Sequence, residues 1–422
     1  MMSKNWPKVT IKDVCESVID CVNKTAPVVE YETPYKMIRT TNVKKGVINL
    51  TGARFVEKAT FEKWTRRAMP RVGDVILTRE APLGDVGMVT TPSENIFLGQ
   101  RLMQYRVDPE KLDAHYLLYA LQGPKLQGQL KAAGSGSTVE HIRVGDAENL
   151  QIELPPISDQ RKIGRVLANY DNLIANNNRR IAILEKIAQS FYREWFVNFR
   201  YTDQTERSDI KGENRSEPNL IDSPIGAIPE GWTVKSAQDA ITINPRTKLN
   251  KSTENPFVSM SGLAENSMVI NDAIQKKGNS GAKFVNGDTL FARITPCLQN
   301  GKTGYVQFLT EEQPVGFGST EFIVLRESED LSSEFIYLLS RSNNFREHAI
   351  QSMTGATGRQ RVHNDCFASL YIAVPPRELM DEFTKLVSPM FKSIFNLSSR
   401  NENLKKQRDM LLPKLIYGDI GL

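Results

Sequence analysis

The sequence repeats itself, and this duplication limits the possible folds more than any other feature of the chain. Residues 73–79 (GDVILTR) recur as residues 287–293 (GDTLFAR), and the same offset carries Pro82 onto Pro296. The double proline at 155–156 recurs at 375–376, with a slightly larger offset. A repeat of this length indicates two copies of one structural unit. The offsets drift because loop lengths differ, which suits one architecture that carries two different specificities.

Each half presents the same order of structural signals. Gly-Asp turns precede short apolar, strand-like segments, and a helical pattern follows at 114–122 and again at 333–341. A loop of small residues comes next, at 134–138 and at 354–358, before the double proline and a long helix. This order predicts an α+β protein. We expect two similar mixed domains with strand-rich cores, separated by two long helices.

The two long helices give the strongest periodic signal. After each double proline, apolar residues alternate at spacings of four and three, which is the pattern of a left-handed coiled-coil seam. The predicted pairing residues of the first helix are Ile163, Leu167, Tyr170, Ile174, Ile181, Leu184 and Phe191. Those of the second helix are Phe383, Val387, Met390, Ile394, Leu397, Leu404 and Leu411.

These stripes could instead belong to two helices that pack separately, each on its own domain. Two stripes of equal length and phase favour mutual pairing, and we predict an antiparallel pair with the domain cores lying elsewhere. Each stripe contains one asparagine, Asn177 or Asn401, and the repeat alignment places them in adjacent layers. Pro389 predicts a kink or a break near the start of the second helix.

These signals divide the chain into five segments. Residues 1–154 form the first globular domain and 155–200 the first spacer helix. The polar segment 201–223 is predicted to be a linker. Residues 224–374 form the second globular domain, and 375–422 the second spacer helix.

Composition excludes several classes of protein. The chain is 40% apolar and 24% charged, as in ordinary globular proteins, and its net charge is only +5. Binding to nucleic acid would therefore depend on local basic surfaces. Four cysteines without a C-x-x-C pair indicate neither a disulfide framework nor structural zinc, and favour the cytoplasm. The first residues contain no apolar signal-peptide core and the chain contains no long apolar run, so we expect neither secretion nor contact with a membrane.

Fragments that imitate catalytic motifs fail on inspection. Residues 300–303 end like a phosphate-binding P-loop, but Pro296 occupies the upstream glycine position. The tetrapeptide that holds a target base in amino-methyltransferases is absent, and the one acidic triplet typical of nucleases, at 209–211, lies in the polar segment. With only four histidines, we predict no catalytic residue and no bound metal or cofactor in this chain.

The remaining chemistry is that of recognition. Basic and amide side chains flank the small-residue loops, where backbone amides can approach phosphate and Arg or Gln can bond base edges. The alternative is an ordinary solvated basic loop, and the recurrence of the loop in both halves favours DNA binding. The DNA-binding candidates are Arg79, Gln100, Arg101, Lys131, Gly134, Ser135, Ser137, Thr138, His141, Arg143, Arg293, Lys302, Thr357, Arg359, Gln360, Arg361 and His363.

Several segments together resemble the DNA-specificity subunit of type I restriction–modification systems. They are residues 154–163 (LPPISDQRKI), 191–196 (FYREWF), 221–232 (IDSPIGAIPEGW), 294–302 (ITPCLQNGK) and 411–418 (LLPKLIYG). Their order covers nearly the whole chain. One departure is visible at 375–380 (PPRELM), which lacks the usual Glu-Gln pair after the prolines and is expected to alter local capping.

The resemblance implies that each domain reads one half of a split target in double-stranded DNA, while the helices set the gap. Its implied partners are two modification (methyltransferase) subunits and restriction (motor and nuclease) subunits. S-adenosylmethionine, ATP and Mg would then be bound by those partners. Two alternatives remain: a diverged DNA-modifying enzyme that acts alone, and a coiled-coil scaffold that binds only protein. Methylation by the chain alone would indicate the first, and failure of the complex to bind DNA the second.

Overall fold

The computed structural model describes the chain except for residues 1–5, 91–94, 135–139, 202–217, 357 and 422. It divides into two compact units, and each unit contains part of both long helices, α5 (Ile157–Phe196) and α9 (Arg377–Ile416). Unit 1 comprises 1–174 and 402–422, and unit 2 comprises 175–401. Most of the predicted linker, 201–223, lies outside the described residues.

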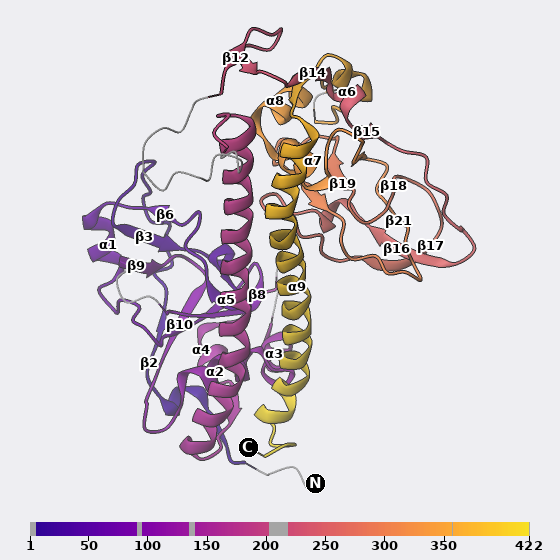
Figure 1. Cartoon of the computed structure of the whole chain (residues 1–422). Coiled ribbons are helices and arrows are strands. Elements are labelled where there is room, and N and C mark those ends of the chain that lie inside the picture. Colours follow the sequence, from indigo (N-terminus) through magenta and orange to yellow (C-terminus); the bar gives the residue numbers. More distant parts are fainter. Residues whose placement is uncertain (1–5, 91–94, 135–139, 202–217, 357, 422) are drawn as a thin grey trace, which may run out of the picture. The chain divides into compact units, whose positions relative to one another are not determined.

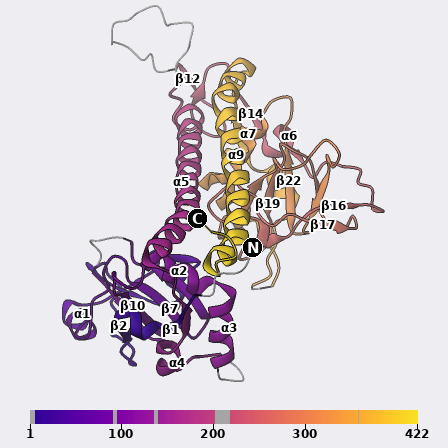
Figure 2. The same cartoon turned by 90° about the horizontal axis from the view of Figure 1, so that it is seen from below.

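Unit 1 is built on a six-stranded sheet with the order β2-β10-β7-β8-β5-β4. A second sheet has the order β6-β3-β9, with β3 parallel to β9, and β1 pairs with β11. Helices α2 and α3 pack against β8, and both helices are labelled in Figure 2. The strands are β1 (Lys8–Thr10), β2 (Cys15–Asp20), β3 (Tyr35–Ile38), β4 (Val43–Lys44), β5 (Gly46–Ile48), β6 (Arg54–Phe55), β7 (Val75–Arg79), β8 (Leu83–Met88), β9 (Asn95–Leu98), β10 (Leu102–Val107) and β11 (Gln151–Glu153). The short helices are η1 (Ile11–Val14), η2 (Thr40–Asn42), α1 (Lys58–Trp64), α2 (Ala114–Gln122), α3 (Pro124–Ala133) and α4 (Val144–Glu148).

Unit 2 repeats this plan with connections of different lengths, and several of its strands and helices are labelled in Figure 1. The order β15-β22-β19-β20 corresponds to β2-β10-β7-β8, and β14 pairs with β23 as β1 pairs with β11. A second sheet has the order β17-β16-β21-β18 and again contains a parallel pair, β16 with β21. The strands are β12 (Leu220–Ile221), β13 (Ile228–Pro229), β14 (Thr233–Ser236), β15 (Thr242–Ile243), β16 (Glu254–Val258), β17 (Ile274–Lys277), β18 (Lys283–Phe284), β19 (Thr289–Ala292), β20 (Thr303–Tyr305), β21 (Gly316–Gly318), β22 (Phe322–Arg326) and β23 (Tyr371–Val374). The short helices are α6 (Ala237–Ala240), η4 (Met260–Gly262), α7 (Ser333–Arg341), α8 (Asn343–Gln351) and η5 (Asn364–Ala368).

Helix starts follow from local sequence. Asp113 accepts a hydrogen bond from the backbone N–H of Tyr116 at the start of α2, and Ser332 does the same for Phe335 at the start of α7. Such caps satisfy amides that have no partner within the helix. Both predicted helical patterns, 114–122 and 333–341, are therefore confirmed.

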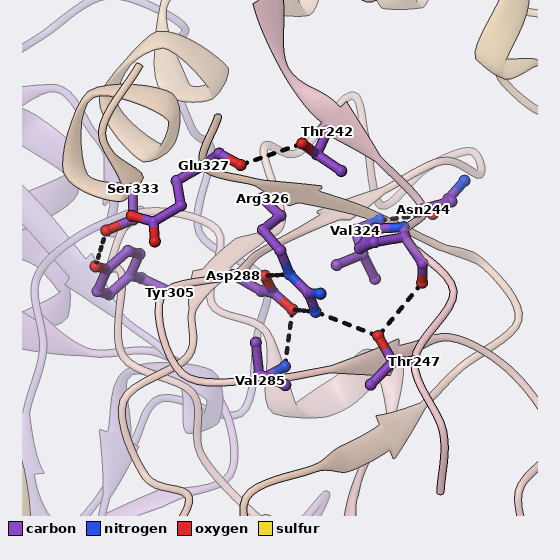
Figure 3. A network of polar contacts seen from close by, with 11 residues as sticks. Thr242, Asn244, Thr247, Val285, Asp288, Tyr305, Val324, Arg326, Glu327 and Ser333 are labelled. Atoms are coloured by element: carbon purple, nitrogen blue, oxygen red, sulfur yellow. Dashed lines mark hydrogen bonds and ion pairs between the residues drawn. The ribbon is translucent and has the colours of Figure 1, made fainter. Parts of the chain in front are cut away.

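A buried ion pair is duplicated with the repeated Gly-Asp turn. Asp74 is paired with Arg106 at 2.7 Å in unit 1, and Asp288 with Arg326 at 2.7 Å in unit 2. In unit 2 the Asp288 carboxylate also accepts the backbone N–H of Val285 at 2.7 Å (Figure 3). Multiple hydrogen bonds offset the cost of burying the carboxylate. The aspartate of the repeat thus ties a turn to the neighbouring strand, which explains why this residue type recurs.

Within unit 2, α5 and α9 pack against each other in opposite directions. Asn177 donates from its side-chain amide to the side-chain oxygen of Asn401 at 2.9 Å, and Asn401 donates to Asn178 at 2.8 Å. The antiparallel pairing thus brings together the two asparagines that the repeat alignment places one layer apart. Within unit 1, Arg408 of α9 is paired with Asp171 of α5, so the helices also pack together there.

The expectation that the domain cores lie away from the seam was wrong. In unit 2, Ala188 of α5 and Ile394 of α9 belong to the same hydrophobic cluster as Phe335 of α7. In unit 1, Leu167 and Leu415 share a cluster with Tyr116 of α2. The reason is geometric: each helix has an apolar stripe wide enough to contact both its partner helix and the adjacent domain.

Pro389 was predicted to cause a kink or a break; it does not break α9, and the kink stays a prediction. The helix runs without interruption from Arg377 to Ile416. A proline removes one backbone hydrogen bond from a helix interior. Val387 and Phe391, on either side of Pro389, are almost fully buried. Their burial stabilises the helical path on both sides of the missing bond.

The starts of α5 and α9 differ at residues 375–380, where the sequence departs from the pattern that it otherwise resembles. In α5, Gln160 donates to the carbonyls of Lys111 and Pro155 and accepts the backbone N–H of Asp113, all at 2.9 Å. Its counterpart in α9 is the buried Met380, whose sulfur accepts only the hydroxyl of Ser332. The departure therefore replaces an amide network with an apolar contact.

The fold class predicted from the sequence, α+β with two similar strand-rich domains and two long paired helices, is confirmed. None of the helices in the described residues is long and apolar enough to cross a membrane.

Candidate nucleic-acid interface

Four DNA-binding candidates of unit 1 lie together around a polar pocket of about 260 Å³. They are Arg79, Gln100, Arg101 and His141, and the lining is completed by Asn23, Glu80 and Ile142. Arg79 ends β7, while Gln100 and Arg101 form the turn that precedes β10. A backbone β-bridge between His141 and Glu80 holds His141 beside these residues. The fold thus gathers residues from three separate parts of the sequence.

Within this pocket Arg79 is held by its own unit. Its Nη2 atom lies 2.7 Å from Oδ1 of Asp20, and its Nη1 atom donates to the carbonyl of Ile142 at 3.3 Å. The Arg79 side chain is only 16% exposed. Arg79 therefore joins β2 to the segment that carries His141.

The Arg101 side chain is more exposed to solvent than that of Arg79. Its guanidinium Nε lies 3.2 Å from Oε2 of Glu80, and the side chain is 52% exposed. Its backbone adopts a left-handed conformation with φ 70°, which is uncommon for a residue other than glycine. The adjacent Gln100 is exposed. This turn presents donors and acceptors suited to base edges or phosphate oxygens.

Unit 2 reproduces the backbone frame of this site. The N–H of Arg293 donates to the carbonyl of Glu321 at 3.0 Å, as Arg79 does to Arg101 at 2.8 Å. The bridge between Ile294 and Arg361 corresponds to that between Glu80 and His141. These matches make Glu321 the counterpart of Arg101, and Arg361 the counterpart of His141.

On this shared frame the charge at the turn position is reversed, from Arg101 in unit 1 to Glu321 in unit 2. Arg361 donates two hydrogen bonds from Nε, at 2.9 and 3.0 Å, and one from Nη2 at 2.6 Å to the carboxylate of Glu321. This contact raises the pKa of Arg361, so the residue stays charged. The turn before the strand is basic in unit 1 and acidic in unit 2, so the two units present different chemistry at equivalent positions.

A hairpin presents the second set of candidates. Thr354 and Arg361 exchange backbone hydrogen bonds at 3.0 and 2.9 Å, which closes the loop between them. Gln360 donates its backbone N–H to Oγ1 of Thr295 at 3.1 Å, and Arg359 is exposed. The hairpin therefore brings Arg361 to Glu321 and Gln360 to Thr295, and leaves Arg359 exposed.

The remaining candidates lie apart from these groups or outside the described residues. Lys131 and Arg143 are exposed near the ends of α3 and α4, and Gly134 ends α3. His363 is exposed at the start of η5. Lys302 donates to the carbonyl of Met260 at 3.2 Å and does not join the Arg361 group. Ser135, Ser137, Thr138 and Thr357 lie outside the described residues.

Sequence reasoning missed the acidic members of both groups, Glu80 and Glu321, and also Asn23. A search for basic residues overlooks carboxylates that orient an arginine. The repeat alignment carried the missing signal, because it sets Glu321 opposite Arg101. Residues 278–283 were also not singled out from the sequence, and they lie beside the turn that contains Glu321. The backbone N–H of Gly318 donates there to the carbonyl of Ala282 at 2.8 Å.

The described part of the chain contains no cluster of three or more His, Cys, Asp or Glu residues positioned to hold a metal ion. The four cysteines are free. Burial raises the pKa of the Cys21 thiol next to Arg79, as does the neighbouring Asp20.

Comparison with known proteins gives a consistent family. The model of the type I restriction modification DNA specificity domain matches twice, at residues 3–186 and 229–405. The chain is similar to the type I restriction enzyme MjaIX specificity subunit of Methanocaldococcus jannaschii, with 25% identity over 434 residues, covering 99% of this chain and 94% of that protein. It is also similar to the HindI specificity subunit of Haemophilus influenzae, with 20% identity, covering 79% of this chain and 80% of that protein.

The fold is also similar to that of a solved structure. The crystal structure of the type I restriction-modification system S subunit from M. genitalium superimposes with a TM-score of 0.57 at 16% identity, covering 98% of this chain and 97% of that chain. The family model alone matches both halves and most of the length of the sequence. The chain therefore belongs to the type I restriction–modification DNA specificity family.

Proposed function

We propose that this chain is the sequence-specific DNA-binding subunit of a type I restriction–modification system. Unit 1 reads one half of a bipartite target in double-stranded DNA, and unit 2 reads the other half. The observation that carries the proposal is the duplicated site frame. The equivalent turn position holds Arg101 in unit 1, paired with Glu80, and Glu321 in unit 2, paired with Arg361, which is the counterpart of His141.

The reversed charge at the turn position supports two different half-sites. An arginine donates to guanine O6 and N7, while a carboxylate accepts from the amino group of cytosine. Two units with one frame and different side chains can read unlike sequences without changing their fold.

We propose further that the chain is not itself catalytic. Two modification subunits bring S-adenosylmethionine, and restriction subunits bring ATP and Mg. The proposed site consists of paired arginines, carboxylates and amides, which suits recognition and provides no arranged nucleophile and base. The free cysteines are compatible with a reducing cytoplasm.

The test is to express the chain with a modification subunit and to map methylated bases by single-molecule sequencing. We expect one split motif, with two defined halves and an unread gap. A matched sample of the chain alone with methyl donor is expected to leave DNA unmethylated. Methylation by the chain alone, or a complex that fails to retain DNA in a gel-shift assay, would contradict the proposal.

A further inference from the structure

Arg79 and Arg293 occupy the same place in the two units. Each ends the equivalent strand, β7 or β19, or follows it directly. The backbone carbonyl of Arg79 accepts the N–H of Ile142 at 3.0 Å, and that of Arg293 accepts the N–H of Val362 at 2.9 Å. Their backbone environments are therefore the same, and any difference between them comes from the side chains around them.

The carboxylate that holds Arg79 is missing from unit 2. Asp20 lies opposite Met103 on β10, and Ile323 is the counterpart of Met103 on β22. In unit 2 the equivalent strand, β15, ends at Ile243, and Asn244 follows it with a left-handed backbone of φ 48°. The strand thus ends before the position that Asp20 occupies in β2, and no strand residue offers Arg293 a carboxylate there.

Arg293 is left without a protein partner among the residues that the structure describes. The Nε atoms of Arg79 and Arg293 are both buried without a hydrogen bond, but the Nη atoms of Arg79 donate to Asp20 and Ile142, whereas no nitrogen of the Arg293 side chain has an acceptor among the described residues. The carboxylate of the nearby Glu321 is taken by Arg361, at 2.6 Å for its shortest contact. Buried and half-buried donors are nearly always hydrogen-bonded, so a guanidinium without an acceptor on any of its nitrogens calls for an explanation such as a missing ligand.

We propose that Arg293 binds an acceptor group of DNA in the half-site read by unit 2, whereas Arg79 is a structural residue. The inference rests on the proposed function and deepens it. The planar guanidinium donates in a fixed fork, and two DNA groups match it: the O6 and N7 atoms of guanine, and the oxygens of a phosphate. The guanine edge and the phosphate oxygens would accept hydrogen bonds from the same N–H groups of the guanidinium.

The experiment uses the chain in complex with its modification subunit and the variants Arg293→Gln and Arg293→Lys, with Arg79→Gln as the matched control. Binding to duplexes that carry the split target is measured at several salt concentrations, together with the methylated motif and the thermal melting of each complex. For Arg293→Gln we expect a loss of about 5- to 150-fold in affinity or in base discrimination.

The two sources of the acceptor give different results. A guanine contact relaxes one position of one half-site, and Arg293→Lys fails to restore it because the fork is lost. A phosphate contact weakens binding to all sequences equally and reduces the salt dependence by about one ion, and Arg293→Lys restores much of it. For Arg79→Gln we expect a lower melting temperature, because Asp20 loses its partner, with the second half-site unchanged.

Unchanged binding, motif and salt dependence in Arg293→Gln, beside an active wild-type complex, would overturn the inference. So would a variant that only lowers the melting temperature, since that is the signature of a structural arginine. A wild-type complex that reads no split motif would instead overturn the proposed function on which the inference rests.

Discussion

Asn177 donates a hydrogen bond from its side-chain amide to the side-chain oxygen of Asn401, 2.9 Å away, at a buried position of the seam between α5 and α9. Buried polar pairs of this kind cost stability but favour one register over its neighbours. A shift of either helix by one heptad would separate the two amides and leave Asn401 opposite Tyr170 or Leu184. The pair therefore specifies how the two helices align within unit 2.

Replacing this pair tests its role in register. Asn177→Leu alone is expected to lower the free energy of unfolding by about 1–3 kcal/mol, because Asn401 keeps a buried amide with fewer partners. The double variant Asn177→Leu with Asn401→Leu is expected to recover this loss or exceed wild-type stability. Chemical denaturation in a double-mutant cycle measures the coupling, and Asn176→Leu on the exposed face is the control. Simple additivity of the two single changes would show that the pair does not interact.

Lengthening both helices tests whether they set the gap between half-sites. The contact between Asn177 and Asn401 places Ile174 opposite Leu404, so seven residues inserted after Ile174 and seven after Asn403 face each other. These insertions add about 10 Å at roughly 1.5 Å per residue and preserve the heptad phase. The unread gap is expected to grow by about three base pairs at 3.4 Å each.

The measurement is the methylated motif of the doubly lengthened complex. The bases read should stay the same, and binding should weaken because three base pairs rotate one half-site by roughly a third of a turn. An insertion in only one helix serves as the control and is expected to abolish assembly. An active complex with the original gap would exclude the helices as the spacer.

The reversed charge at the turn position predicts effects confined to one half-site. Arg361→Gln and Glu321→Gln are expected to relax the half read by unit 2, at about 1–3 kcal/mol for each base that is no longer hydrogen-bonded. Arg101→Gln is expected to relax only the half read by unit 1. Methylome sequencing of the three variant complexes distinguishes these outcomes. An equal loss of base preference in both halves of the motif would show that these side chains affect the stability of the complex or contact the phosphate backbone.

Glu185 predicts a dependence of stability on pH. Burial in α5 raises the pKa of Glu185, against the opposing effects of the Met268 N–H, the Ser267 hydroxyl and Arg341. The folded state therefore takes up a proton more readily than the unfolded state. Stability is expected to fall as the pH rises from the unfolded pKa through the raised folded pKa, and the cost is fully present above it.

Glu185→Gln removes this buried charge and keeps an oxygen that can accept both hydrogen bonds. The variant is expected to gain about 1 kcal/mol at neutral pH and to lose this component of the pH dependence. Thermal melting from pH 4 to pH 8 measures both effects, with the exposed Glu347→Gln as the control. A variant less stable than wild type across the whole range would show that the ionised carboxylate stabilises the fold.

Much of the architecture could be predicted from the sequence. Repeated turns, capped helices and heptad stripes are local patterns, and the backbone responds to them within a few residues. The duplication extended each such prediction to a second copy. This is why the fold class and both short helices, Ala114–Gln122 and Ser333–Arg341, could be predicted without tertiary information.

The tertiary structure decided which side chains pair with one another. The repeat alignment set Asn177 and Asn401 apart, and the opposite direction of the helices brought them together. Arg79 and Arg293 are the same residue in the same motif, yet among the described residues only Arg79 is paired with a carboxylate, because Asp20 belongs to a strand whose counterpart in unit 2, β15, ends at Ile243. Hydrogen bonds and ion pairs depend on which segments lie within a few ångströms of each other, and that proximity is set by the packing of the whole unit.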